Sequence, residues 1–235
     1  MMDSKMILKG KGSFPILGKT GAMLLLLLSS GCAVFQPRAF LELECAPQAS
    51  LPAPQSFQAV QSVVFSFYGR KMTGIGVISL NRSDRTFELS CMTPMGTKLF
   101  DLRYANETPE VLFALPFFTE KGDFAEAVAL DIARMYFDPE PPRISRAWRK
   151  GDTLTIESED EELRIEYDYH GTPPVLMEKR FHRDRALEAV ITYSKFFEQD
   201  GFRCIGEASL KSKLYGYRLT VRTKELTLHP ERIAK

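Results

Sequence analysis

Apolar and polar side chains alternate one by one along much of this chain, and this pattern constrains its fold more than any other feature. In residues 162–169, four apolar residues alternate with four charged ones. Successive side chains of a strand point to opposite faces, so this segment predicts a strand that is buried on one face only. Leu154 and Ile156 show the same period before a polar turn at 158–161. Together the two segments predict a half-buried hairpin.

Similar short segments recur from residue 60 to residue 222, and turn-forming residues such as those at 81–84 separate them. The segment 202–210 is predicted as one of these strands. Residues 123–137 break the rhythm, because their apolar residues recur at helical spacing behind a predicted N-cap at Asp123. The pattern therefore predicts roughly nine strands and one main helix.

A sheet of this size has an apolar face that must be covered. It can close on itself, or it can curl around the helix and the loops. We therefore expect a mainly β protein of the α+β type, an antiparallel half-barrel sheet with one main helix as plug or lid. The segment 112–118, which contains Pro116, is expected to help the helix fill the sheet.

Basic residues and a short apolar run open the chain. Four Lys precede Ala22–Leu28, and this run of seven residues leads into Ser-Ser-Gly-Cys32. Such an order predicts a secretory signal peptide, whereas a spanning helix needs about 20 apolar residues. Ser-Ser-Gly-Cys resembles the bacterial lipobox, although Ser29 stands where the lipobox has an apolar residue. The resemblance implies lipidation of Cys32 and, with Ala33 next, an outer-membrane address. An ordinary signal peptide is the alternative.

The predicted processing divides the chain into four parts. Residues 1–31 are the signal peptide, 32–57 the lipid-anchored cysteine and a Pro-rich tether, 58–224 the β half-barrel domain, and 225–235 a C-terminal tail. Prolines disfavour regular structure in the tether, and an extended segment packed along the domain is the alternative. Without its leader the chain keeps 27 basic and 29 acidic residues. This balance excludes a strongly basic nucleic-acid binder.

Three cysteines remain besides the one assigned to lipid: Cys45, Cys91 and Cys204. One disulfide with one free thiol fits this number, and so does the absence of any disulfide. Cys91 and Cys204 lie in apolar, strand-like segments, where a free cysteine packs as a small apolar residue. No CxxC pair occurs, so a thioredoxin-like or zinc-ribbon site is not indicated.

The search for catalytic motifs is negative, with no GxSxG, HExxH, P-loop or GxGxxG sequence. The tripeptide His-Arg-Asp at 182–184 occurs in kinases but lacks their other motifs here, and we interpret it as a charged turn. We interpret the acidic run 159–162 as a solvated hairpin tip rather than a cation site. The basic segment 143–150, with Trp148, is interpreted as a polar loop, and a contact with anionic lipid headgroups is the alternative. We expect no enzyme, no cofactor and no metal.

Several short segments resemble the LolB-type lipoproteins, and others are similar to a related family of short Gram-negative outer-membrane lipoproteins, some encoded with aryl-polyene lipid synthesis. The first set is 67–69, 74–76, 85–89 and 94–99, the last matching a P-x-G-x-x-L turn; the second is 130–132, 179–193 and 215–219. Together they span about residues 58–224. The resemblance implies a LolA/LolB-like half-barrel, closed by helices, with an apolar cavity for the acyl chains of lipoproteins.

The leader and the resemblance together suggest a function. We expect a monomeric lipoprotein, held on the periplasmic face of the outer membrane by its acyl chains, that binds or transfers a hydrophobic ligand: an acyl chain, a lipid or a lipoprotein. Binding would come from apolar burial and needs no catalytic residue. The alternative is a non-catalytic lipoprotein with a solid interior that docks an envelope complex. The loop residue with which LolB-type proteins insert cargo matches no position here, so insertion is not implied.

Strand parity places a set of apolar residues on the inner face of the sheet, where they could line such a cavity. For each of them, plain core is the alternative. These candidate cavity residues are Leu89, Cys91, Phe100, Leu102, Leu163, Ile165 and Tyr167.

Overall fold

A computed structural model describes residues 39–42, 51–67, 70–119, 124–159 and 163–229. The chain divides into two units, Met1–Pro37 and Arg38–Lys235, and every described residue belongs to the second. The predicted signal peptide, Cys32 and Cys45 lie outside the described residues. Within those residues, no helix is both long enough and apolar enough to cross a membrane.

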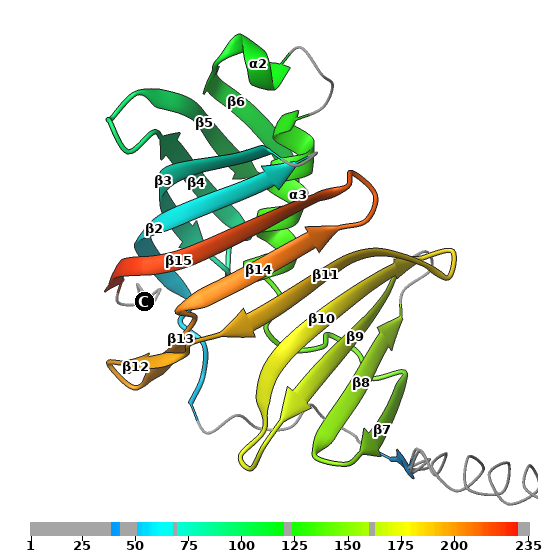
Figure 1. Cartoon of the computed structure of the whole chain (residues 1–235). Coiled ribbons are helices and arrows are strands. Elements are labelled where there is room, and N and C mark those ends of the chain that lie inside the picture. Colours follow the sequence, from blue (N-terminus) through cyan, green and yellow to red (C-terminus); the bar gives the residue numbers. More distant parts are fainter. Residues whose placement is uncertain (1–38, 43–50, 68–69, 120–123, 160–162, 230–235) are drawn as a thin grey trace, which may run out of the picture. The chain divides into compact units, whose positions relative to one another are not determined.

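The described residues form one large antiparallel sheet of thirteen strands (Figure 1). In sheet order these are β1 (Ala39–Leu41), β7 (Arg146–Lys150), β8 (Thr153–Glu159), β9 (Leu163–His170), β10 (Val175–Arg183), β11 (Ala186–Ser194), β14 (Glu207–Ser212), β15 (Tyr217–Leu228), β2 (Ser56–Phe67), β3 (Arg70–Asn81), β4 (Thr86–Met92), β5 (Lys98–Ala105) and β6 (Thr108–Ala114). A separate hairpin joins β12 (Phe197–Gln199) to β13 (Phe202–Cys204). The sheet is open rather than closed into a barrel, because β1 and β6 form its two edges. The predicted mainly β, antiparallel fold is confirmed.

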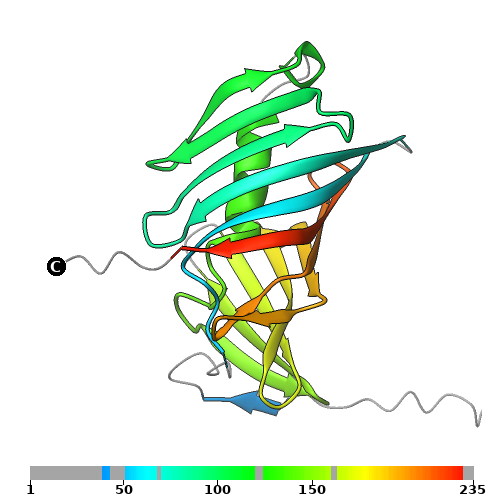
Figure 2. The ribbon, with the colours of Figure 1, turned by 90° about the vertical axis from the view of Figure 1, so that its left-hand side faces the viewer.

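The first and last long strands of the sheet lie side by side in its middle, where Val63 of β2 is opposite Val221 of β15. From β2 the chain runs strand by strand to the β6 edge. It then crosses through α2 (Pro116–Thr119) and α3 (Phe124–Tyr136) and returns from β7 to β15. Figures 1 and 2 show α3 lying across one face of the sheet. The predicted helix is therefore confirmed, and it covers the sheet at the crossover.

The main hydrophobic core lies between α3 and the sheet. Ile132 and Met135 of α3 are buried, as are Ile78, Leu102 and Ile191 on the strands that face them. The residues at helical spacing in α3 thus meet the residues at strand spacing in the sheet, which is how two elements of different period share one apolar layer.

The predicted hairpin at 153–169 is confirmed as β8 and β9, with Ile156 opposite Tyr167. Both side chains are fully buried, and they form a second, smaller core cluster with Ala147, Leu154 and Tyr169. The charged residues that alternate with them lie on the other face of the sheet.

The sheet includes residues near both ends of the chain that are predicted to lie outside it. Leu228 of β15 lies opposite Phe57 of β2, so residues 225–228 belong to the sheet and not to a tail. A register shift between Thr223 and Glu225 interrupts the alternation there, which hides this end of the strand from a period-two search. Part of the expected tether also pairs with the sheet, because residues 39–41 form β1 beside β7.

Besides β1 and β12, two longer strands lie where none is predicted. The interpretation of 143–150 as a polar loop is wrong, because β7 occupies most of it and its Arg146 Nε donates to Glu157 Oε1 at 2.8 Å. β6 carries three consecutive apolar residues, 111–113, and an edge strand of this kind has no alternation to detect. The predicted strand 202–210 is two strands, β13 and β14, because the chain leaves the main sheet for the β12–β13 hairpin.

Candidate functional site

Two apolar hollows lie between α3 and the sheet. Hollow A has a volume of about 100 Å³ and is lined by the C-terminal end of α3, by Phe57 and Tyr193 of the sheet, and by Leu226. Hollow B has a volume of about 70 Å³ and is lined by Val128 and Ile132 of α3 together with residues of α2, β2, β3, β4, β5 and β15. Both hollows therefore open onto the face of the sheet that α3 covers.

Gln61 of β2 lines both hollows. Its Nε2 donates a hydrogen bond of 2.8 Å to the hydroxyl oxygen of Tyr136, the last residue of α3. Both side chains are buried, and burial raises the pKa of Tyr136 to about 12, so the phenol stays protonated. This contact joins helix and sheet where hollow A meets hollow B.

Three of the seven predicted cavity residues line hollow B: Leu89, Cys91 and Phe100. Leu102 is packed core, and Tyr167 belongs to the second core cluster. Leu163 and Ile165 are partly buried and pack against the main core. These four residues line neither hollow. Strand parity thus predicts which residues lie on the inner face of the sheet, but not which of them border a hollow.

Phe118 of α2 lines hollow B and packs edge-on against Phe100, with 5.4 Å between the ring centroids. The segment 112–118 therefore helps the helix fill the sheet, because Ala114 and Leu115 also pack against the main core, while residues 112–114 belong to β6. Gly76 of β3 lies on the same wall, and a Cβ there would come within 3.1 Å of Val63 Cγ2. A side chain at this position would require Val63 to shift by a few tenths of an ångström, so glycine fits this close contact between neighbouring strands.

The two described cysteines, Cys91 and Cys204, are buried free thiols. Burial raises the pKa of Cys91 to about 11 and also raises the pKa of Cys204. A thiol of this kind is not ionised near neutral pH and is a poor nucleophile. Cys91 therefore acts as an apolar wall residue of hollow B.

Asp131 is the one charged side chain among the described residues that line hollow B. It is 3% exposed, and its Oδ2 has no hydrogen-bond donor in the described part of the chain. Burial raises its pKa to about 7, although the positive charge of Arg134 opposes this shift. The sequence analysis does not identify Asp131 as a site residue. The sequence does contain a sign of its position, because Asp131 lies at helical spacing between Val128 and Ile132, on the apolar face of the helix.

Three buried side chains bond successive carbonyl oxygens at the C-terminal end of α3, those of residues 134–136. Lys179 Nζ donates at 3.1 Å, the Tyr193 hydroxyl at 2.8 Å and Arg82 Nε at 2.6 Å, in that order along the helix. The last carbonyls of a helix have no partner within it, and positive charge is favoured at that end. These bonds fix the C-terminal end of α3 to the sheet.

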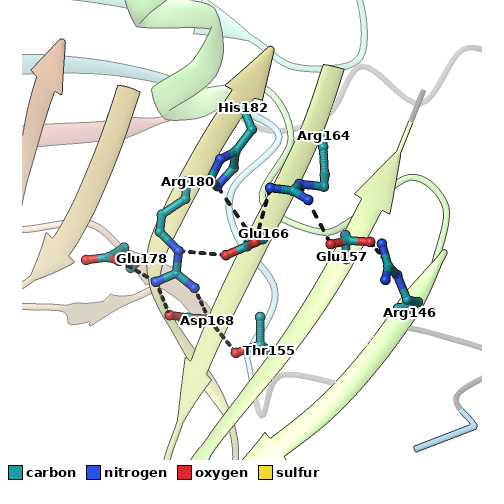
Figure 3. A network of polar contacts seen from close by, with 9 residues as sticks. All are labelled: Arg146, Thr155, Glu157, Arg164, Glu166, Asp168, Glu178, Arg180 and His182. Carbon is teal, nitrogen blue, oxygen red and sulfur yellow. Dashed lines mark hydrogen bonds and ion pairs between the residues drawn. The ribbon is translucent and has the colours of Figure 1, made fainter. Parts of the chain in front are cut away.

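A network of charged residues covers the other face of β7 to β10, as Figure 3 shows. At its centre, Arg180 bonds Asp168 at 2.6 Å, Glu178 at 2.7 Å and Glu166 at 2.8 Å. His182 Nε2 lies 3.7 Å from Glu166, and burial lowers the pKa of this imidazole. Neither hollow reaches these residues, so the network stabilises strand pairing and faces away from the candidate site.

The prediction of a charged turn at 182–184 is confirmed only for Asp184, which forms the turn into β11 with Arg185, because His182 and Arg183 belong to β10. Of the acidic run 159–162, residues 160–162 lie outside the described residues. In the described ranges, no group of three His, Cys, Asp or Glu side chains is arranged to hold a metal ion.

No family profile matches this chain, and no curated protein matches it. Among solved structures, a LolA superfamily protein from Nitrosomonas europaea is similar, with a TM-score of 0.53, 12% identity and coverage of 77% of this chain and 90% of that one. A DUF1329 family protein from Desulfovibrio piger aligns with a TM-score of 0.46 at 8% identity, over 76% and 87% of the chains. A domain described as an outer membrane lipoprotein-sorting protein, from Vibrio parahaemolyticus, aligns with a TM-score of 0.40 at 10% identity, over 75% and 86%. The first of these likenesses shows a LolA-like fold, and at this identity it shows the fold alone.

Proposed function

We propose that this chain binds a hydrophobic ligand between α3 and the sheet, in hollows A and B. The observation that carries the proposal is hollow B itself, an apolar space enclosed by a LolA-like sheet and its crossover helix. Burying apolar ligand surface there would contribute about 25 cal/mol per Å². Such a site needs no catalytic group, which agrees with the protonated thiol of Cys91 in its wall.

The volumes of the hollows imply that ligand binding widens them. Hollows A and B measure about 100 and 70 Å³, whereas ligand pockets usually measure about 300–1,000 Å³. The C-terminal end of α3 is held by hydrogen bonds from two strands, β10 and β11, and from the turn after β3. Beside hollow B the helix contributes Val128, Ile132 and Asp131, and Asp131 Oδ2 forms no hydrogen bond among the described residues. Apolar contacts of this kind are easier to replace by a ligand than the hydrogen bonds at the C-terminal end of the helix. We therefore expect this part of α3 to move away from the sheet on binding.

The same proposal extends to the place where the protein works. We propose a lipoprotein anchored in the outer membrane through Cys32, facing the periplasm, with an acyl chain, a lipid or a lipoprotein as its ligand. The basic leader, the Ser-Ser-Gly-Cys32 sequence and the resemblance to short Gram-negative lipoproteins support it. The test is labelling with a palmitate analogue in cells. The wild-type chain should carry the label and sediment with membranes, and Cys32→Ala should lose both properties. An unlabelled wild-type chain would contradict the anchor.

Ligand binding is tested with diphenylhexatriene, a hydrocarbon probe that fluoresces in apolar surroundings. Val128→Phe places a ring in hollow B, whereas Leu130→Phe places the same ring on the exposed side of α3. We expect the purified wild-type chain and Leu130→Phe to bind the probe, and Val128→Phe to bind at least about tenfold more weakly. Thermal melting checks that both variants fold. Absence of binding by the wild-type chain, or equal binding by Val128→Phe, would overturn the proposal.

A second candidate function, docking to an envelope complex, is favoured by a different observation. The edge strand β6 exposes Val111, Leu112 and Phe113, each at least 40% exposed, and an apolar edge strand is a template for pairing with another chain. A photo-crosslinker at Leu112 should then capture one envelope protein in cells, and the same group at Thr220 of the central strand β15 should not. Equal capture at both positions would contradict docking at β6.

A further inference from the structure

We infer that Asp131 selects the ligand of hollow B, so that the ligand is an amphiphile with a hydrogen-bond donor, an O–H or N–H group, on its apolar chain. This inference rests on the proposed function and makes it more specific. It concerns which molecules bind, whereas the proposed function concerns only that an apolar ligand binds.

The geometry of Asp131 carries the inference. Val128, Asp131 and Ile132 follow one another at helical spacing and all line hollow B. Asp131 is 3% exposed, and its Oδ2 is buried without a donor among the described residues. Buried polar atoms nearly always have a partner, because an unpaired one loses the hydrogen bonds that water gave it. An unpaired oxygen in the wall of a hollow is therefore an acceptor that a ligand can satisfy.

The donors nearest to this wall do not bond Asp131, although the buried Nε of Arg134 has no partner of its own among the described residues. Gln61, which lines both hollows, donates its Nε2–H to the hydroxyl oxygen of Tyr136. Arg134, one turn along α3 from Asp131, directs its Nη2 to Glu188 and stacks on the ring of Phe181. No hydrogen bond or ion pair joins Arg134 to Asp131 among the described residues. The acceptor is thus left to whatever occupies the hollow.

The chemistry of a carboxyl group in an apolar wall separates classes of ligand. A hydroxyl, an amide N–H or an amine on an alkyl chain would bond Oδ2 while its chain lies against residues such as Leu89 and Ile132. Above pH 7, where the carboxyl group is ionised and has no O–H to donate, an ether or a plain hydrocarbon would leave the oxygen unpaired. An anionic headgroup placed at the same point would meet a second negative charge. The buried oxygen of Asp131 therefore favours ligands that carry an O–H or N–H donor over ligands that carry none.

The test compares dodecan-1-ol with its methyl ether as competitors of diphenylhexatriene, because the two share a chain and differ in the donor. We expect the wild-type chain to prefer the alcohol by about tenfold, which corresponds to about 1.4 kcal/mol. Asp131→Asn keeps an acceptor oxygen but gains an N–H that can donate to the ether, so its preference should lie between those of the wild type and Asp131→Leu. Asp131→Leu removes the acceptor and should bind the alcohol and the ether equally, while it still binds diphenylhexatriene.

The outcomes separate this inference from the function on which it rests. If the wild-type chain binds diphenylhexatriene but the alcohol and the ether displace it equally, the inference is wrong and the proposed function stands. If Asp131→Leu keeps the preference for the alcohol, the inference is also wrong, because another group recognises the donor. If diphenylhexatriene does not bind to the wild-type chain, the proposed function itself fails. The comparison of alcohol with ether in the wild-type chain does not depend on any variant folding.

Discussion

Gln61 and Tyr136 lie 75 residues apart in the sequence, and their side chains form a buried hydrogen bond of 2.8 Å between β2 and the end of α3. Gln61 lines hollow A on one side and hollow B on the other. If a ligand binds as proposed, this contact would limit how far its apolar chain can extend from one hollow into the next.

Gln61→Ala should join the two hollows. We expect the variant to bind hexadecan-1-ol more tightly, relative to octan-1-ol, than the wild-type chain does, because a longer chain can pass beneath Tyr136. The Tyr136 hydroxyl loses its donor, so the free energy of unfolding should fall by about 1–3 kcal/mol. Competition with diphenylhexatriene and urea unfolding measure the two effects.

Tyr193→Phe is the matched control for that variant. It also removes a buried hydrogen bond, from the Tyr193 hydroxyl to the Met135 carbonyl, but Tyr193 lines hollow A alone. Its stability should fall by a similar amount with no change in the preference for long chains. An unchanged preference in Gln61→Ala would show that the contact does not separate the hollows.

Arg82→Met should destabilise the protein through the end of α3. The Arg82 guanidinium bonds the carbonyls of Tyr136 and Pro54 in a buried position, so its loss leaves acceptors without donors. We expect the free energy of unfolding to fall by about 3 kcal/mol. Arg85→Met is the control, because Arg85 pairs with Asp138 on the surface and its loss should cost less than about 1 kcal/mol. Similar losses for both arginines in chemical denaturation would contradict this anchor.

Stability should depend on pH through Asp131. Burial raises its pKa in the folded chain to about 7, against about 3.9 in an unfolded chain. Between these values the folded state binds more protons than the unfolded state, so the stability contributed by this group falls as the pH rises from about 4 to about 7. Asp131→Leu removes this dependence. The variant should gain on the wild type as the pH rises through that window, by about 4 kcal/mol at most.

Urea unfolding of both chains at several pH values measures this difference. A constant difference between the wild type and Asp131→Leu from pH 4 to pH 8 would show that the carboxyl group titrates normally. Such a result would also remove the physical reason to regard Asp131 as an unpaired buried group.

Arg180→Met should lower stability and leave ligand binding unchanged. Its three carboxylate partners, Glu166, Asp168 and Glu178, would lose the charge that bridges them. We expect a loss of about 2 kcal/mol in the free energy of unfolding, because the network is only partly exposed. Diphenylhexatriene affinity should stay within about twofold, since the network lies on the face away from hollow B. A large loss of affinity would contradict the separation of the two faces.

The sequence patterns were sufficient for elements whose period is regular. The alternation in 162–169 predicted a strand, and the helical spacing in 123–137 predicted α3, because each element buries one face and the period reports it. The patterns failed where an element buries no face or changes register. The exposed edge strand β6 and the bulged end of β15 are these cases.

The hollows were beyond prediction from one sequence for a related reason. Leu89 and Leu102 lie directly opposite each other on β4 and β5 and face the same side of the sheet. Leu89 borders hollow B, whereas Leu102, on the same face, is packed core. Asp131 illustrates the same limit: its spacing is visible in the sequence, but the lack of a donor at Oδ2 emerges only from packing.

The most direct test of the central claim is to locate a bound ligand by nuclear Overhauser effects between protonated dodecan-1-ol and a perdeuterated, methyl-labelled chain. We predict magnetisation transfer from the alkyl chain to the methyl groups of Leu89 and Ile132, which line hollow B, and none to Ile156 in the second core cluster. If the ligand binds but magnetisation transfer is confined to the exposed residues Val111 and Leu112 of β6, binding in hollow B is contradicted.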